Sequence, residues 1–79
     1  MGRDKMLRRV TLFGPLKDDF GKRELQIEAG GDETVRSILE RLEIQPDIVK
    51  VALDGEISEL DTQLSDSIEI AILPPVSGG

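Results

Sequence analysis

The clearest helical pattern in the chain lies in GGDETVRSILERLEIQP, residues 30–46, and it sets the fold class. Its apolar residues recur at i, i+3, i+4 and i+7, the spacing of a helix with one apolar face: Val35, Ile38, Leu39 and Leu42. Either Asp32 or Thr34 can cap the first turn, and Pro46 prevents continuation. The stretch therefore predicts one amphipathic helix near the middle of the chain.

Two alternating segments precede this helix and predict a hairpin. The first spans residues 7–13 and alternates two sets of side chains, Val10 with Leu12 and Arg9 with Thr11 and Phe13. The second alternates apolar and polar residues: Leu25, Ile27 and Ala29 with Glu24, Gln26 and Glu28. Gly14-Pro15 ends the first segment, and residues 17–21 are expected to form a polar turn between the two strands.

The segments after the helix predict further strands. Alternating Val49, Val51 and Leu53 predict a third strand, and Asp54-Gly55 is a favoured tight-turn pair that leads into a short return strand at Ile57. Residues 60–64 are expected to form a tight turn or one 3₁₀ turn. The last strand then alternates two sets of residues, Ile68, Ile70 and Ile72 on one face and Glu69, Ala71 and Leu73 on the other.

The order of these elements, β-β-α-β-(β)-β, indicates an α+β protein. It matches the β-grasp, or ubiquitin-like, arrangement, in which a mixed sheet of four to five strands packs on one main helix. In that arrangement the first and last strands lie side by side and parallel at the sheet centre. We expect residues 1–73 to form one β-grasp domain and residues 74–79 an extended tail, with Met6 as an alternative start.

Composition restricts the chemistry that the domain can perform. The 79 residues include no histidine or cysteine, so we expect no metal site, thiol nucleophile or imidazole base, and no self-contained active site. The net charge of −6 disfavours nucleic acid, and no apolar run reaches the roughly 20 residues of a membrane helix. A protein of the cytoplasm with a basic protein partner fits this composition.

The end of the chain carries the candidate chemistry in a tail that follows the last strand: Pro74, Pro75, Val76, Ser77, Gly78 and Gly79. Two prolines end a β-ladder and favour an extended conformation, and glycines can thread a narrow channel in another protein. A carboxylate at Gly79 is a poor electrophile and requires activation, typically as a mixed anhydride with AMP. A frayed terminus can also contain two glycines, but their context here favours function.

With its tail LSDSIEIAILPPVSGG at residues 64–79, the chain from about residue 7 resembles the small subunit of molybdopterin synthase, in the wider MoaD/ThiS family. The resemblance implies an accessory subunit of a sulfurtransferase that binds no cofactor itself. An E1-like enzyme would adenylate Gly79 with ATP, and a sulfur donor enzyme would convert it to a thiocarboxylate. The large synthase subunit would then receive the tail and use the sulfur to build molybdopterin.

Some positions depart from the family pattern without affecting the tail. Ser67-Ile68 stands where the family usually has Gly-Asp, Asp54 where Asn is common, and Ile72-Leu73 where an aromatic pair is frequent. These departures leave the subfamily open.

Alternation of the strands also predicts a partner-binding surface. If Val10 and Ile70 face the helix, then Phe13 and Leu73 point to the opposite face, with Ile57 nearby. Contiguous exposed apolar residues usually mark an interface, and the resemblance places partner contacts at these three positions. A second minor core under a loop is the alternative.

Three functional hypotheses remain open at this stage. Pro74-Pro75 favours a molybdopterin carrier over a thiamine-type sulfur carrier. A ubiquitin-like protein modifier joined to lysines through Gly79 would share the fold and the tail. A plain interaction domain would use the sheet face alone and would tolerate deletion of the two glycines.

Overall fold

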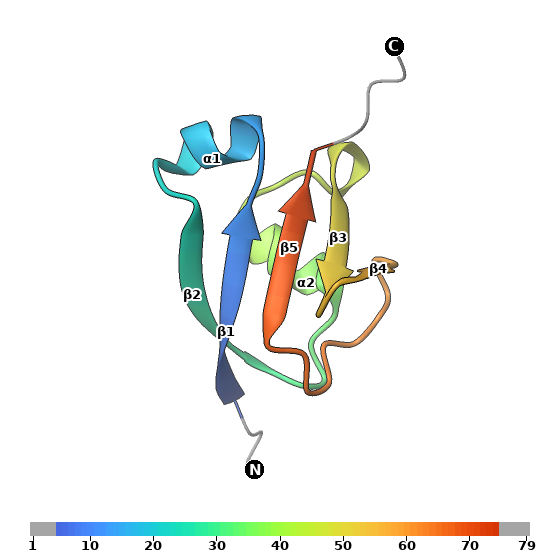
Figure 1. Ribbon diagram of the computed structural model, residues 1–79. Helices are drawn as coiled ribbons and strands as arrows, with labels where there is room; N and C mark the ends of the chain where they lie inside the picture. The colour runs from blue at the N-terminus through green and yellow to red at the C-terminus, as the bar shows by residue number, and fades with distance from the viewer. Residues whose placement is uncertain (1–4, 75–79) are drawn as a thin grey trace.

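A computed structural model describes residues 5–74 and shows a five-stranded sheet with one helix behind it (Figure 1). In chain order its elements are β1 (Lys5–Leu12), α1 (Pro15–Phe20), β2 (Glu24–Gly30), α2 (Val35–Arg41), the 3₁₀ helix η1 (Pro46–Ile48), β3 (Lys50–Leu53), β4 (Glu56–Ser58) and β5 (Glu69–Leu73). The predicted α+β, β-grasp class is confirmed. Most of the predicted tail, residues 75–79, lies outside the described residues.

The strand order of the sheet is β2-β1-β5-β3-β4. Central strands β1 and β5 are parallel, with Val10 opposite Ile70, and the other neighbouring strands are antiparallel. This confirms that the first and last strands lie side by side at the sheet centre. Because they are parallel, both strands finish at the same end of the sheet, the end where α1 lies (Figure 1).

Helix α2 packs its apolar stripe on the sheet, and Val35, Ile38 and Leu39 are buried in the core. Of the two candidate caps, Thr34 is the N-cap: its hydroxyl oxygen accepts a hydrogen bond of 3.2 Å from the backbone N–H of Ser37. The helix already ends at Arg41, because Glu43 adopts a left-handed φ of 61°. Pro46 does not terminate α2 but begins η1.

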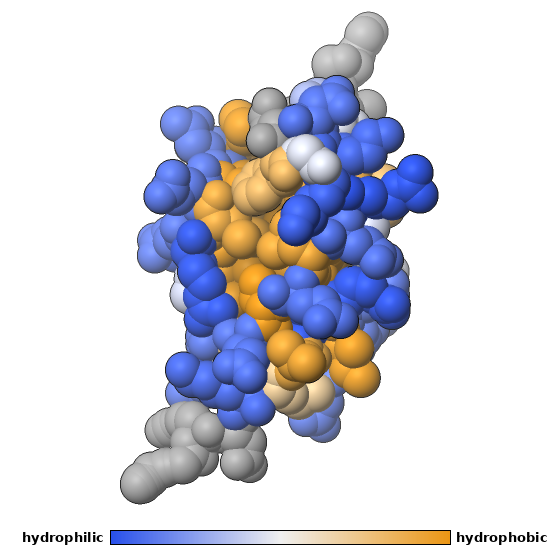
Figure 2. Space-filling model, turned by 90° about the vertical axis from the view of Figure 1, so that its left-hand side faces the viewer, coloured by the Kyte–Doolittle hydropathy of each residue, from blue (hydrophilic) through white to orange (hydrophobic). Residues whose placement is uncertain are grey.

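The core lies between α2 and the inner face of the sheet. Predicted inward residues Val10, Leu12, Ile70 and Ile72 are all buried, together with Val51, Leu53 and the loop residue Leu64. Along the β2 edge the core is less completely covered, and Figure 2 shows apolar side chains between charged ones there. Partly buried residues on that side of the core include Phe20, Leu25, Ile27 and Leu42.

The predicted polar turn at residues 17–21 is wrong, because this segment belongs to α1. Pro15 begins the helix, Leu16 is buried against the core, and Phe20 packs against it four residues later. Gly21 then closes α1 with a left-handed φ of 73°, and its N–H donates to the Asp18 carbonyl. A helix of six residues has only two apolar core contacts, Leu16 and Phe20, which is too few to show a helical period in the sequence. The charged residues between them are typical of a turn, and this led to the wrong prediction.

The predicted inward position of Ile68 is also wrong: Ile68 precedes β5 and is 53% exposed. The reason is the Asp54 side chain, which accepts hydrogen bonds from the N–H groups of Ile68 (3.1 Å) and Glu69 (3.0 Å). Asp54 thus binds the two N–H groups at the start of β5, while the Ile68 carbonyl accepts the N–H of Arg9 on β1 at 2.8 Å. The polar segment before it forms turns and an isolated bridge between Thr34 and Gln63.

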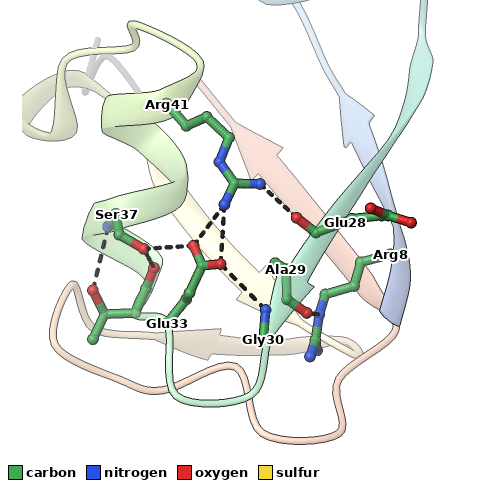
Figure 3. A network of polar contacts seen from close by, with 8 residues as sticks. Arg8, Glu28, Ala29, Gly30, Glu33, Ser37 and Arg41 are labelled. Carbon is green, nitrogen blue, oxygen red and sulfur yellow. Dashed lines mark hydrogen bonds and ion pairs between the residues drawn. The ribbon is translucent and has the colours of Figure 1, made fainter. Parts of the chain in front are cut away.

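A polar network ties α2 to the edge strand β2 (Figure 3). The Arg41 guanidinium donates to the Glu33 carboxylate at 2.8 Å and to the Glu28 carbonyl at 2.7 Å. The Glu33 carboxylate also accepts the N–H of Gly30 at 3.2 Å. The network thereby satisfies two backbone groups on β2 without a further strand.

Candidate functional site

The candidate tail follows a strand that is paired on both sides. β5 pairs with β1 on one side and with β3 on the other, where Leu73 lies opposite Lys50. Pro74 follows β5 directly, is half-buried and has no N–H to extend the ladder. The expectation that the ladder ends at the prolines therefore holds at Pro74.

The other predicted tail residues, Pro75, Val76, Ser77, Gly78 and Gly79, lie outside the described residues. Their identity still defines the chemistry that they can offer. Serine and glycine provide no acid, base or thiol, so the reactive group of this segment would be a carboxylate at Gly79.

The three residues predicted to bind a partner occupy different places at the outer side of the sheet. Phe13 immediately follows β1 and is 42% exposed, Ile57 is on β4 and is 62% exposed, and Leu73 ends β5 and is half-buried. Val10 and Ile70 do face α2, so the alternation that placed Leu73 outward is consistent with the core.

A row of mostly small residues crosses the outer face of the sheet and ends at Ile57, and one of its members, Ala52, was missed by the sequence analysis. Residues directly opposite each other in a sheet share a face, and the register places Thr11 opposite Ala71, Ala71 opposite Ala52, and Ala52 opposite Ile57. We call this row of four residues the outer row. Ala71 and Ala52, which have small side chains, lie between Thr11 and Ile57 in this row. The same period-two alternation places these alanines on the outer face, but a single alanine within a strand is a weak sequence signal for a binding surface.

Charges border the outer row on one side. Arg9 and Glu69 lie opposite each other on β1 and β5 and form a half-exposed ion pair at 3.5 Å. Ile57 also lines an open crevice of about 380 Å³ between β3, β4 and the start of α2. Its lining is mainly apolar and includes Val35, Pro46, Val49 and Leu60, with Lys50 and Glu59 as charged residues. This lining offers packing surface rather than a pair of groups for acid–base chemistry.

Across residues 5–74, no three histidine, cysteine, aspartate or glutamate side chains gather closely enough to bind a metal ion. No helix in this part of the chain is long and apolar enough to span a membrane.

Comparisons with known proteins agree with this geometry. The sequence pattern of the ThiS family matches residues 10–79. The chain is 28% identical to SAMP1 from Haloferax volcanii, over 94% of this chain and 100% of that one, with a TM-score of 0.75. It is 32% identical to a chain in the complex of subunits 1 and 2 of molybdopterin-converting factor from Helicobacter pylori, over 94% of this chain and 100% of that one, with a TM-score of 0.63.

A putative molybdopterin converting factor subunit 1 from Pyrococcus furiosus shares the fold, with a TM-score of 0.75 at 22% identity over 90% of this chain and 99% of that one. Among curated proteins, none matches significantly. The family pattern covers far more than half of the chain and includes β5, Pro74 and both terminal glycines. The chain belongs to the ThiS family, in the class of ubiquitin-like sulfur carriers and protein modifiers.

Proposed function

We propose that this protein is a sulfur carrier whose Gly79 carboxylate is converted to a thiocarboxylate that supplies sulfur for molybdopterin synthesis. The observation that carries the proposal is the ThiS-family match through Gly79, in a chain whose central strand β5 leads directly into the Pro74-Pro75 tail. Absence of histidine and cysteine also favours a carrier, because the catalytic groups would then belong to its partners.

The proposed chemistry proceeds in two steps on an E1-like activating enzyme. A carboxylate oxygen of Gly79 attacks the α-phosphorus of ATP, so that a phosphorus–oxygen bond forms and pyrophosphate leaves. A hydrosulfide equivalent from a sulfur donor enzyme then attacks the acyl carbon. A carbon–sulfur bond forms, the bond to AMP breaks, and a thiocarboxylate and a proton result. ATP is thus a substrate of the activating enzyme rather than a cofactor of this chain.

The proposed recipient is a molybdopterin synthase large subunit. Support comes from the similarity to a chain in a complex of molybdopterin-converting factor subunits 1 and 2. Phe13 and Ile57 expose apolar side chains on the outer side of the sheet, where the half-buried Leu73 leads into the tail. Docking through this surface would bring the tail to the partner's active site.

A second candidate function is that of a ubiquitin-like modifier conjugated through Gly79. This candidate is favoured by the similarity to SAMP1 from Haloferax volcanii and to the small archaeal modifier protein 1 of Methanosarcina acetivorans, at 28% and 27% identity. A thiamine-type carrier also remains compatible with the family. The candidates share activation of the carboxylate and differ in what receives the acyl group or the sulfur.

An adenylation assay tests the shared step. With a candidate E1-like enzyme, the full chain should support exchange of pyrophosphate into ATP, and a chain lacking Gly78 and Gly79 should not. Equal exchange with both chains would overturn the proposal. Gly-Gly remnants on lysines of cellular proteins, dependent on this chain, would favour the modifier over the carrier.

A further inference from the structure

Gly14 lies directly against the first residue of the tail. Leu12, two residues before Gly14, lies opposite Ile72, two residues before Pro74, on the parallel strands β1 and β5, so the chain segments that follow both strands emerge at the same end of the sheet. A Cβ atom placed on Gly14 would lie 2.9 Å from Cγ of Pro74 and 3.5 Å from its Cβ. The Pro74 ring therefore packs where any other residue at position 14 would have its side chain.

The backbone of Gly14 also requires glycine. Its φ of 64° and ψ of −141° lie in a region that residues with a Cβ rarely adopt. Pro15 contributes to this conformation, because a residue before proline is disfavoured in the helical region. The Gly14 carbonyl then accepts a hydrogen bond of 3.1 Å from the N–H of Lys17. Gly14 is thus held between the end of β1 and the first turn of α1.

We propose that Gly14 is a positioning residue for the tail, an inference that rests on the proposed carrier function. Every tail atom connects to the body through Pro74, and the ring of Pro74 fixes its own φ. The bare Cα of Gly14 lets this ring seat against the loop between β1 and α1. Gly14 thereby sets the place and direction from which the tail starts toward the active site of an activating enzyme.

A side chain at position 14 should therefore lower the rate of adenylation more than it weakens binding of the carrier to the activating enzyme. In Gly14→Ala the Pro74 ring has to move, while Ile57, Ala52 and Ala71 of the outer row are untouched. Since a misplacement of about 1 Å can cost on the order of 100-fold in rate, we expect kcat for adenylation to fall roughly 10- to 100-fold. The KM for the carrier should change less than about threefold, because the surface of the domain away from Gly14 and Pro74 is unchanged.

Gly21→Ala is the matched control. Gly21 also has a left-handed φ, of 73°, but no atom lies within 4 Å of the Cβ that it would gain. Both variants place alanine at a positive φ beside α1, with the greater strain at Gly14, whose ψ of −141° lies outside the left-handed helical region that Gly21 occupies, and only Gly14→Ala displaces Pro74. Steady-state adenylation of both variants should show the loss of kcat for Gly14→Ala alone. If the two variants have equal kcat values in an assay in which the wild-type chain is adenylated, the positioning role is wrong.

A double-mutant cycle with Pro74→Ala identifies the contact responsible. Alanine at position 74 removes Cγ, the atom at 2.9 Å, so Gly14→Ala should lower kcat much less in that background than in wild type. The same fold-loss in both backgrounds would show that strain, rather than the Pro74 contact, causes the effect. A wild-type chain that an active enzyme never adenylates would instead refute the proposed function itself, and the positioning role with it.

Discussion

Arg8 shows how single residues hold this small domain together. It is on the inner face of β1 and is 1% exposed, an uncommon place for a cation. Its Nε donates to the Ala29 carbonyl at 3.0 Å, and its Nη1 donates to the Ser67 carbonyl. Among the described residues its Nη2 has no partner. Arg8 thus connects β1, β2 and the turn before β5 through backbone oxygens.

Arg8→Ala should lower the free energy of unfolding by about 3 kcal/mol, because it leaves a cavity and two carbonyls without their charged donor. Arg8→Met, which keeps most of the volume and removes the buried charge, should cost clearly less. Urea unfolding followed by circular dichroism would measure both. If Arg8→Met costs as much as Arg8→Ala, the hydrogen bonds rather than the volume dominate, and the predicted order is wrong.

Gly79→Ala tests the separation between body and tail at the level of one residue. We expect the rate of thiocarboxylate formation to fall at least about tenfold, because a methyl group on the Cα atom next to the reactive carboxyl carbon hinders access in a narrow channel. Thermal unfolding should stay within roughly 2 °C of wild type, since Gly79 follows the core strand by several residues. A large drop in melting temperature with normal transfer would contradict this separation.

Phe13→Arg tests the partner surface. Replacing an exposed apolar residue beside the outer row with a charge should weaken binding of a large subunit by about tenfold or more. Ile68→Arg is a suitable control, because Ile68 is similarly exposed but lies before β5, at the end of that strand away from Pro74. Calorimetric titration would compare them. Unchanged affinity for Phe13→Arg, or equal losses in both, would dismiss the predicted surface.

At the scale of elements, β2 is an edge strand whose outer side is contacted by Glu33 and Arg41. In the antiparallel pair of β1 and β2, the N–H of Leu12 donates to the Arg23 carbonyl. Every second residue from Arg23 onward therefore bonds to β1, and the residues between them, which include Glu28 and Gly30, direct their backbone groups away from β1. Arg41 and Glu33 satisfy the Glu28 carbonyl and the Gly30 N–H on that edge. An ion pair thus covers part of an edge that would otherwise be open to pairing.

Arg41→Ala should loosen this edge locally. We expect the free energy of unfolding to fall by less than about 1 kcal/mol, because the Arg41–Glu33 pair is partly exposed to solvent. Amide hydrogen exchange at Gly30 should nevertheless become faster, since Glu33 loses the partner that orients it. Unchanged exchange at Gly30 would mean that Glu33 holds this N–H without Arg41.

The elements also show what could be predicted from the sequence. Period-two alternation located the interiors of β1, β2 and β5, and the i, i+3, i+4 pattern located α2, because burial on one face imposes these periods. The turn predicted in place of α1 and the inward Ile68 were wrong, because both depend on contacts with distant residues. Ala52 and Ala71 became visible as a shared row only through the strand register.

At the scale of the whole molecule, a small acidic domain precedes a tail whose proposed reactive group is a single carboxylate. The strand that leads into the tail, β5, is paired on both sides, with β1 and with β3. The parallel pairing of β1 and β5 was expected from the β-grasp arrangement, whereas the contact between Gly14 and Pro74 had no sequence signal. Local patterns do not report that contact, because it joins segments 60 positions apart in the chain.

The most direct test of the central claim is the intact mass of the purified chain after incubation with ATP, an E1-like enzyme and a sulfur donor. The account predicts an increase equal to the difference between one sulfur and one oxygen atom, localised by fragmentation to Gly79 and absent without ATP. An unchanged mass, with an enzyme shown to be active on another carrier, would contradict the claim that Gly79 becomes a thiocarboxylate.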